Sequence, residues 1–295
     1  MVQKTVEGRG DDMKVALIGS KGQLGQDIAR HVPSSVELKP FVHEDFDITE
    51  KEEIFNFLCE KNKFDLIINT AAFHKTDQCE DEPHKAFLVN AVGVKYLVDV
   101  CIETGACLLH ISTDYVFDGR KIDTKEPYTE EDIPNPINIY GISKYAGELI
   151  IQNYLEKYYI VRVASLYGKA GASGKGGNFV YTILNKAKRG EPLKVIDDIY
   201  MSPTYTHDVA QKIWEIVLEQ KPYGVYHITN SGYCSWYEFA KKIIEYAGLE
   251  SEIKPVKHTE FKTKARRPLW SPLRSVKGVE MRGWEEALAE FIKNI

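Results

Sequence analysis

Short apolar runs alternate with helix-like segments through the first 165 residues, and this order strongly limits the possible folds. The run Lys14–Ile18 is followed at once by a glycine, as is typical of a buried strand that ends in a turn. The same pattern predicts strands over 14–18, 36–41, 65–69, 107–111 and 159–165, and helices over 23–32, from 49 onward, over 82–104 and over 143–157. Such alternation predicts an α/β fold, with a doubly wound parallel sheet of the Rossmann type.

The second half of the chain is less regular. Helices are predicted near 179–189, 207–219, 236–247 and 284–293, and short strands at 194–197 and 225–229. We therefore predict one unit over residues 13–165 and a smaller, interwoven lobe mainly over 166–295, with segments near 194–219 returning to the first unit. The polar residues 1–12 are expected to form a flexible extension, and the glycine-rich stretch 170–177 a mobile loop.

Composition excludes several classes of protein. The net charge of -5 gives no electrostatic reason to bind nucleic acid or an anionic membrane. No apolar run approaches the roughly 20 residues that span a bilayer. The five cysteines contain no Cys-x-x-Cys pair, and no His/Cys/Asp/Glu cluster has the spacing of metal ligands. We expect a cytoplasmic monomer or homodimer that binds no metal, nucleic acid or membrane.

A glycine-rich turn joins the first predicted strand to the first predicted helix. Gly19, Gly22 and Gly25 follow the spacing Gly-x-x-Gly-x-x-Gly. Glycines let the backbone turn tightly and approach a pyrophosphate closely, and the N-terminus of the following helix attracts the anion. An ordinary glycine turn would look similar, but the position between strand and helix favours a dinucleotide site.

An acidic stretch, Glu44–Asp47, lies about 20 residues further on, where a carboxylate commonly meets a ribose. A solvated loop is the alternative interpretation. No arginine follows the second predicted strand, and Lys21 and His43 are the nearby cations. The choice between NADPH and NADH therefore stays open, with a slight preference for NADPH.

Tyr140 and Lys144 stand four residues apart at the start of a predicted helix, so they share one face. An ammonium near a phenol lowers the pKa of the phenol, which can then exchange a proton with a carbonyl oxygen. Thr113 ends the fourth predicted strand, where its hydroxyl could hold the same oxygen. Tyr-x-x-x-Lys alone is common, but its combination with Thr113 and the glycine turn predicts a nicotinamide cofactor beside a proton-donating tyrosine.

Further polar residues follow strand ends or lie in the second lobe. The adjacent Arg266 and Arg267 suit a diphosphate, although a solvated basic loop would look the same. Asn178 could hydrogen-bond a ligand or cap the next helix. His74 follows the third predicted strand, at the edge where a doubly wound sheet binds ligands.

Six segments carry a resemblance to a known family. They are Gly22-Gln-Leu-Gly25, Asn69-Thr-Ala-Ala72 with Asp77, Ser112-Thr-Asp-Tyr-Val-Phe-Asp-Gly119, Tyr140-Gly-Ile-Ser-Lys144, Pro203-Thr204 with Asp208-Val-Ala210, and Ala265-Arg-Arg-Pro268 with Ser271. From Met13 nearly to its end, the chain resembles an extended short-chain dehydrogenase/reductase, most closely the dTDP-4-dehydrorhamnose reductases. The resemblance implies NAD(P)H-dependent reduction of the 4-keto group of dTDP-4-dehydro-β-L-rhamnose, a nucleotide-sugar, to dTDP-L-rhamnose.

The resemblance also implies a role for each matching position. Thr113, Tyr140 and Lys144 would be catalytic: Tyr140 protonates the alkoxide, Thr113 orients the carbonyl, and Lys144 tunes Tyr140 and holds the ribose. The cofactor would be bound by Tyr140 and Lys144, and also by Gly19, Gly22, Gln23, Leu24, Gly25, Asp47, Ile48, Ala71 and Ala72. The nucleotide-sugar would be contacted by Asp114, Tyr115, Asn178 and Arg267, to which we add His74 from its position.

Two departures from the family pattern keep alternatives open. The family's usual tryptophan after the fifth strand is replaced by Ser165-Leu166, and Trp270 stands where asparagine is usual, which we expect to change the nucleotide pocket. Another nucleotide-sugar is therefore an alternative substrate, although Tyr115 argues against a 4,6-dehydratase, which has glutamate there. The chain also resembles the non-catalytic β-subunit of methionine adenosyltransferase, but Thr113, a serine in that protein, favours an enzyme.

Overall fold

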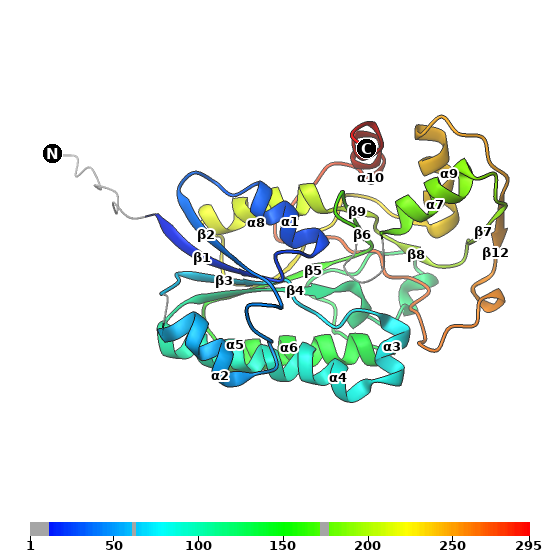
Figure 1. Ribbon diagram of the computed structural model, residues 1–295. Helices are drawn as coiled ribbons and strands as arrows, with labels where there is room; N and C mark the ends of the chain where they lie inside the picture. The colour runs from blue at the N-terminus through cyan, green and yellow to red at the C-terminus, as the bar shows by residue number, and fades with distance from the viewer. Residues whose placement is uncertain (1–11, 61–62, 172–176) are drawn as a thin grey trace, which may run out of the picture.

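The centre of the molecule is a sheet of six parallel strands in the order β10-β5-β4-β3-β1-β2 (Figure 1). The computed structural model describes residues 12–60, 63–171 and 177–295. The six strands are β1 (Met13–Ile18), β2 (Val36–Phe41), β3 (Leu66–Asn69), β4 (Cys107–Thr113), β5 (Tyr158–Val163) and β10 (Gly224–His227). The predicted α/β class with a parallel sheet is therefore confirmed.

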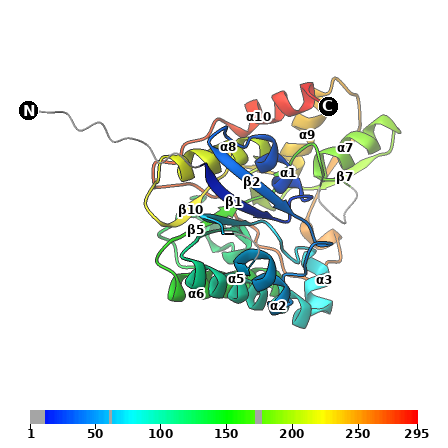
Figure 2. The same cartoon turned by 60° about the vertical axis from the view of Figure 1, so that its left-hand side comes forward.

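Helices cover both faces of this sheet, as Figure 2 also shows. One face carries α1 (Gln23–Arg30) and α8 (Thr206–Leu218), and the other carries α2 (Lys51–Phe55), α5 (Gly93–Thr104) and α6 (Ile139–Tyr154). Successive side chains of a strand point to opposite faces. Val15 and Leu17 of β1 accordingly pack towards α1 and α8, whereas Ala16 and Ile18 pack towards α5. Burial on both faces explains why these strands read as continuous apolar runs.

The helical stretch expected over 82–104 is confirmed as a continuous run of α4 (Pro83–Phe87), the π-helical η2 (Leu88–Val92) and α5. The chain between β2 and β4 also contains η1 (Asn56–Glu60) and α3 (Thr76–Asp81). The helix expected from residue 49 begins two residues later, because α2 starts at Lys51 after Glu50 as its N-cap. The Thr49 hydroxyl donates to Asp47 Oδ1 at 2.8 Å.

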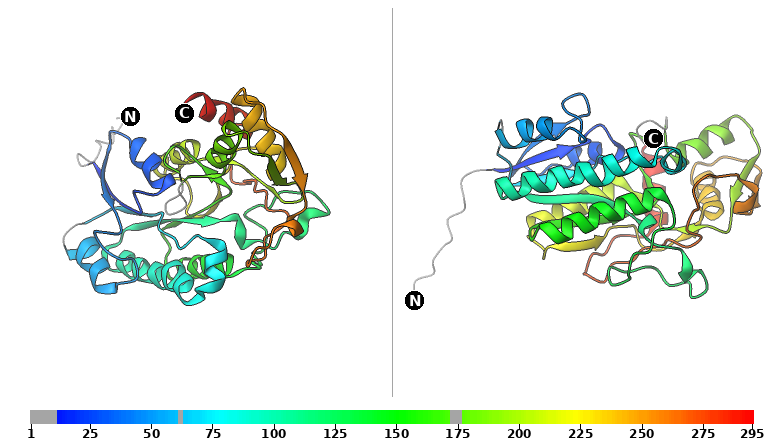
Figure 3. Two further views of the ribbon diagram at one scale, coloured as in Figure 1. Left: turned by 45° about the vertical axis from the view of Figure 1, so that its right-hand side comes forward. Right: turned by 90° about the horizontal axis from the view of Figure 1, so that it is seen from below.

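A smaller lobe packs beyond the ends of the central strands, to the right of the sheet in Figure 1 and in both views of Figure 3. Its core is aromatic, with the Tyr167 and Tyr205 rings stacked at 5.5 Å and with Phe239 and Phe291 beside them. The remaining elements are η3 (Asp114–Val116), η4 (Arg120–Ile122), β6 (Leu166–Tyr167), α7 (Phe179–Lys188), β7 (Leu193–Ile196), β8 (Tyr200–Met201), β9 (Thr204–Tyr205), β11 (Cys234–Ser235), α9 (Trp236–Tyr246), β12 (Ile253–Val256), η5 (His258–Glu260) and α10 (Trp284–Lys293).

The two halves of the sequence are interwoven. Helix α8 packs on α1, where Trp214 Nε1 donates to the Ile28 carbonyl at 3.0 Å, and β10 extends the sheet beside β5. Strand β7 pairs instead with β12 in the smaller lobe. The division at residue 165 stays a prediction, and the expectations for residues 1–11 and 172–176 fall outside the described residues. In the described ranges, no helix combines the length and apolar character needed to cross a membrane.

Candidate active site

A cavity of about 1090 Å³ lies where the carboxyl ends of β1, β2, β3, β4 and β5 meet the smaller lobe. This is the edge at which doubly wound sheets bind ligands. The cavity is lined by every residue to which the sequence gave a catalytic, cofactor or substrate role, except Arg266 and Trp270: Gly19, Gly22, Gln23, Leu24, Gly25, Asp47, Ile48, Ala71, Ala72, His74, Thr113, Asp114, Tyr115, Tyr140, Lys144, Asn178 and Arg267. The fold therefore brings together residues that are up to about 250 positions apart in the chain.

The glycine turn has the shape that close approach to an anion requires. Gly19 has a φ of +78°, and a Cβ on Gly25 would lie 2.4 Å from the Gly19 carbonyl oxygen. Helix α1 begins directly after its N-cap Gly22, which has no side chain with which to bond the first backbone N–H groups. Those groups and the helix dipole favour a negative ligand at this end of the cavity.

Replacing Gly25 with alanine is expected to weaken NADPH binding at least tenfold and to lower the unfolding free energy by about 1–3 kcal/mol, because the added methyl group forces the turn apart. Fluorescence titration and urea denaturation measure the two effects. The control is Gly283→Ala, since a Cβ at Gly283 meets no atom within 4 Å. Unchanged NADPH affinity in Gly25→Ala would show that this turn does not bind the cofactor.

Charged side chains surround the end of the cavity formed after β2. Asp47 Oδ1 accepts hydrogen bonds from the backbone N–H of Thr49 at 2.9 Å and from its hydroxyl at 2.8 Å, so this carboxylate is held in place. Lys21 Nζ lies 3.2 Å from Glu44 Oε1, and both side chains are exposed. Lys21, His43, Glu44 and Asp47 all line the cavity. Two basic side chains and two carboxylates thus surround the part of the cavity where a phosphate of the cofactor would lie.

Thr113 connects the end of β4 to Tyr140 on α6. Its hydroxyl accepts from the Tyr115 backbone N–H at 3.2 Å and donates to Asp114 Oδ1 at 3.0 Å, and it lies close enough to the Tyr140 phenol to act on its pKa. Asn138 caps α6 by accepting from the Gly141 N–H at 2.8 Å, which sets Tyr140 in the first turn. Two hydroxyl groups from different elements thus meet at one point of the cavity.

The pKa of Tyr140 is raised, whereas the sequence argument expected Lys144 to lower it. Desolvation by burial is the main cause of the rise, and the Thr113 hydroxyl opposes it. The Lys144 ammonium group does not offset burial because its Nζ is held elsewhere, donating to the Ile111 carbonyl at 2.7 Å and lying 2.9 Å from His110 Nε2. Tyr140 therefore keeps its proton at neutral pH.

Asp114 is a buried carboxyl group on the wall of the cavity. Its side chain is 4% exposed, and its Oδ2 has no hydrogen-bond partner among the described residues. Burial raises the pKa of Asp114 from 3.8 to about 6, although hydrogen bonds act in the opposite direction. A ligand hydroxyl that donated to Oδ2 would relieve part of this cost.

Replacing Asp114 with asparagine is expected to remove a pH-dependent cost of folding. Because the folded state holds the proton more tightly than the unfolded chain, wild-type stability falls as the pH rises from about 4 to about 6, by about 3 kcal/mol. The unfolding free energy of the variant minus that of the wild type should rise over this window and level off above it. Urea denaturation between pH 4 and pH 7.5 measures the difference, and a constant difference would contradict the assigned environment.

The substrate residues predicted in the second lobe are partly engaged with the protein itself. Asn178 caps α7 by accepting from the Tyr181 N–H at 3.2 Å, and its amide donates to Gln23 Oε1 at 3.0 Å and to the Gly168 carbonyl at 2.8 Å. One lone pair of its oxygen is left for a ligand. Its capping role, open from sequence, is thus established, and it ties the glycine turn to the smaller lobe.

The two adjacent arginines differ in position. Arg267 lines the cavity and pairs with Asp77, with both nitrogen–oxygen distances at 3.3 Å. Arg266 is exposed, and its carbonyl accepts from the Asn138 amide at 2.8 Å. A diphosphate in this cavity would therefore meet Arg267 and not the pair.

A buried ion pair supports the catalytic end of the site. Arg162 on β5 donates to both oxygens of Glu148 on α6, at 3.0 Å from Nε and 2.6 Å from Nη2, and Ser112 donates to the same carboxylate. Glu148 is 0% exposed and Arg162 is 3% exposed. The pair joins α6, which bears Tyr140, to β5, and the Ser112 bond joins Glu148 to β4, which ends at Thr113.

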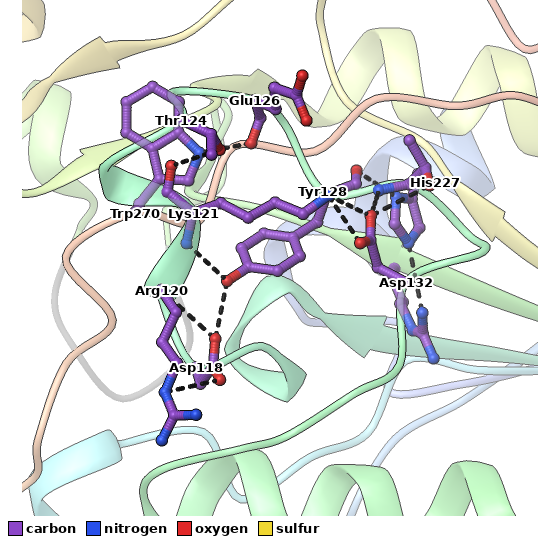
Figure 4. Close-up of polar contacts among 11 residues, drawn as sticks. Asp118, Arg120, Lys121, Thr124, Glu126, Tyr128, Asp132, His227 and Trp270 are labelled. Atoms are coloured by element: carbon purple, nitrogen blue, oxygen red, sulfur yellow. Dashed lines mark hydrogen bonds and ion pairs between the residues drawn. The ribbon is translucent and has the colours of Figure 1, made fainter.

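A loop over residues 118–132 packs against the C-terminal segment, and Figure 4 shows its polar contacts. Asp118 accepts from the Tyr128 hydroxyl at 2.8 Å, and the Tyr128 carbonyl lies 3.1 Å from His227 Nδ1. Trp270 Nε1 donates to the Glu126 carbonyl at 2.8 Å. Trp270 is fully buried and does not line the cavity, so the expectation that it changes the nucleotide pocket is wrong. It anchors the C-terminal segment beneath this loop.

Two features near the catalytic residues escaped the sequence argument. His110 contacts Lys144 from within β4, and Glu148 neutralises Arg162. His110 is the one strongly polar residue in the apolar run 107–111, and this position could have marked it as unusual. The ion pair joins a helix to a strand across the sheet face, and no local spacing reveals such a contact.

Comparison with known proteins gives a consistent picture. The model of the RmlD substrate binding domain family matches residues 13–295. The chain is 39% identical over 290 residues to the spore coat polysaccharide biosynthesis protein SpsK of Bacillus subtilis, covering 95% of this chain and 97% of that one. It is 34% identical over 293 residues to the dTDP-4-dehydrorhamnose reductase of Aggregatibacter actinomycetemcomitans, with 93% and 97% covered.

Solved structures agree with these relatives. The dTDP-4-dehydrorhamnose reductase of Bacillus anthracis in complex with NADP matches with a TM-score of 0.90 at 37% identity, covering 96% of this chain and 100% of that one. The ortholog from Clostridium acetobutylicum matches with a TM-score of 0.88 at 39% identity, with 96% and 99% covered. The chain thus belongs to the RmlD substrate binding domain family, the dTDP-4-dehydrorhamnose reductases, which are NAD(P)-dependent oxidoreductases of the extended short-chain dehydrogenase/reductase class.

Proposed function

We propose that this protein uses NAD(P)H to reduce the 4-keto group of dTDP-4-dehydro-β-L-rhamnose, which gives dTDP-L-rhamnose. The observation that carries the proposal is the meeting of the Thr113 and Tyr140 hydroxyl groups in the cavity that the glycine turn also lines. Two hydroxyl groups at one point suit a carbonyl oxygen that becomes an alkoxide. The names of the relatives and of the matching structures support this substrate.

The glycine turn fits a dinucleotide, because a Cβ at Gly19 or Gly25 would meet neighbouring atoms within 3 Å and would fill the turn. We propose that the cofactor is held by Gly19, Gly22, Gln23, Leu24, Gly25, Asp47, Ile48, Ala71, Ala72, Tyr140 and Lys144. When bound, NAD(P)H supplies the hydride. Lys21 and His43 in the lining, and the NADP in the Bacillus anthracis relative, support NADPH as the preferred form.

The chain's own catalytic groups are Thr113, Tyr140 and Lys144. Tyr140 gives its phenolic proton to the oxygen on sugar C4, and its raised pKa keeps that proton in place until the alkoxide forms. The Thr113 hydroxyl holds the same oxygen and so orients the carbonyl. The Lys144 ammonium would hold the nicotinamide ribose.

The nucleotide-sugar would lie against the smaller lobe. We propose that Asp114 accepts a hydrogen bond from a sugar hydroxyl, because its buried Oδ2 is otherwise without a partner among the described residues. Arg267 would bind the diphosphate, with Asp77 holding its guanidinium in place. Tyr115, His74 and Asn178 line the same region.

Another nucleotide-sugar is the second candidate, and a specific observation favours it. Ser165 and Leu166, which replace the family's usual tryptophan, both line the cavity. Ser165 also has a φ of +42°, an uncommon conformation for a residue other than glycine. The substitution therefore lies where it can change which sugar fits.

The test is the oxidation of NADPH and of NADH with enzymatically generated dTDP-4-dehydro-β-L-rhamnose. We expect turnover with both cofactors to be measurable and turnover with NADPH to be faster. Cofactor binding without turnover would move the search to other nucleotide-sugars, and then to a protein partner of a regulatory subunit. The absence of both cofactor binding and turnover would contradict the proposal as a whole.

We further propose that the protein works in the cytoplasm, as a monomer or a homodimer. The five cysteines all lie in described segments and form no disulfide. Burial raises the pKa of Cys107 to about 12, and it also raises the pKa of Cys101 and of Cys234, so these thiols are poorly reactive. These features suit a reducing compartment.

A further inference from the structure

A buried polar chain of three side chains lies behind the catalytic residues. Asn69 on β3 and His110 on β4 occupy paired positions of neighbouring strands, and both are 0% exposed. Asn69 Nδ2 lies 3.1 Å from His110 Nδ1, and His110 Nε2 lies 2.9 Å from Lys144 Nζ. Lys144 is 1% exposed. The family roles described above use Lys144 but neither of the other two residues.

The partners of Asn69 determine the tautomer of His110. The Ala71 backbone N–H can only donate, and it donates to Asn69 Oδ1 at 3.0 Å. The Asn69 amide therefore presents its NH₂ group to His110 Nδ1, which must accept. Burial lowers the pKa of His110 well below its usual value, so the ring is neutral and carries one proton. That proton is assigned to Nε2, on the side of Lys144.

This tautomer favours one protonation state of Lys144. A ring N–H that points at Nζ needs a lone pair, which only the neutral amine offers. Nζ meanwhile donates to the Ile111 carbonyl at 2.7 Å, and the neutral amine still has protons for that bond. An ammonium would need Nε2 as an acceptor. The ring proton would then lie on Nδ1, where it would face the Asn69 NH₂ group, which is also a donor. The chain therefore disfavours the ammonium.

Other groups around Lys144 bear on its charge. Burial lowers the pKa of Lys144 to about 7, and the Glu148 carboxylate, which Arg162 neutralises, acts in the opposite direction. The titratable groups that act on Lys144 are His110 on β4, whose Nε2 lies 2.9 Å from Nζ, and Glu148 on its own helix α6. The sole direct side-chain partner of Nζ among the described residues is His110.

We propose that Asn69 and His110 are positioning residues that act through Lys144: the tautomer that Asn69 imposes on His110 favours the neutral amine of Lys144 over the ammonium. This inference rests on the proposed function, in which Lys144 works as an ammonium. Reduction of a ketone consumes one proton from solvent in each turnover. An amine that titrates near neutral pH suits this exchange better than an ordinary lysine, whose pKa is about 10.4.

Asn69→Asp keeps the shape of the side chain but replaces the donor that faces His110 Nδ1 with an acceptor. Its carboxylate accepts both from the Ala71 N–H and from a proton on His110 Nδ1, so Nε2 becomes an acceptor for the ammonium. His110→Gln removes the ring without adding charge, and its amide oxygen can accept from the ammonium. The fall of kcat/KM at high pH should move up by about one pH unit or more in each variant, which is about a tenfold change in the ratio of the two forms.

The tautomer is measured directly from the ¹⁵N signals of the histidine rings, with the His110 signals identified by their loss in His110→Gln. We expect the proton on Nε2 in the wild type and on Nδ1 in Asn69→Asp. This measurement needs no substrate, so it tests the inference separately from the proposed function. Melting curves show which variants fold, and His110→Gln alone suffices for the pH profile.

The double variant separates the tautomer from simple charge. If Asn69→Asp acts through His110, it should move the pH profile little further in the His110→Gln background. The same upward movement in both backgrounds would overturn the inference. A wild-type proton on Nδ1, or a pH profile that moves in neither single variant, would also overturn it.

Discussion

Replacing Tyr140 with phenylalanine is expected to lower turnover about a thousandfold while NADPH still binds. The variant loses only the phenolic hydroxyl, which is the proton donor for the alkoxide, and general acid catalysis is worth about a hundredfold to ten-thousandfold. The aromatic ring remains beside Tyr115, whose ring centre lies 5.9 Å away. Steady-state rates and NADPH fluorescence titration measure the two quantities.

The matched control is Tyr145→Phe. Tyr145 lies on the same helix, in the next turn, and does not line the cavity. Its variant should keep the wild-type rate. If Tyr140→Phe also kept that rate, Tyr140 would not be the proton donor and the proposed mechanism would fail.

Replacing Arg162 with methionine is expected to lower the unfolding free energy by about 3–5 kcal/mol, because it leaves the buried Glu148 carboxylate without its partner. An unpaired buried carboxylate takes up a proton more readily in the folded state than in the unfolded chain. The loss should therefore shrink as the pH falls. Urea denaturation at pH 5 and pH 8 measures both effects.

Two further variants test whether the loss of stability comes from the unpaired charge. Adding Glu148→Gln to Arg162→Met removes the unpaired charge and should restore a large part of the stability at pH 8. Arg189→Met breaks a surface ion pair with Glu191 and should leave the denaturation curve close to that of the wild type. Equal losses at pH 5 and pH 8, with no recovery in the double variant, would show that the pair contributes through packing and not through charge.

Much of the fold follows from local patterns in the sequence. Strands such as β1 are buried on both faces, so their apolar runs and terminal glycines could be recognised without knowing their neighbours. Strand β10 was located, but its place beside β5 depends on long-range pairing that no local pattern encodes. The helix predicted from residue 49 begins later, at Lys51, because its N-cap is Glu50, which makes no side-chain cap hydrogen bond and is not one of the usual N-cap residues.

The parts of the site that belong to sequence motifs at strand ends and helix starts could be predicted. The glycine turn, Thr113 and the Tyr140–Lys144 pair all follow strand ends or start helices, and parallel strands bring such positions to one edge. The family resemblance is confirmed by the match over residues 13–295. The roles of the individual site residues stay predictions, and their tests are given above.

The burial of individual side chains could not be predicted from the sequence. The pair Tyr140 and Lys144 suggested a lowered phenol pKa, but the amine turns to His110 on a neighbouring element and burial dominates. Trp270 looked like a pocket residue by alignment with the family pattern, yet it packs beneath the loop over 118–132. In both cases a contact distant in sequence decided the outcome.

The most direct measurement follows the hydride itself. NADPH that carries deuterium at both positions of nicotinamide C4 would be mixed with the protein and dTDP-4-dehydro-β-L-rhamnose. The account predicts dTDP-L-rhamnose that is one mass unit heavier, with the deuterium on sugar C4 by NMR. A product without deuterium, or with deuterium on another carbon, would contradict the claim that this site reduces the 4-keto group.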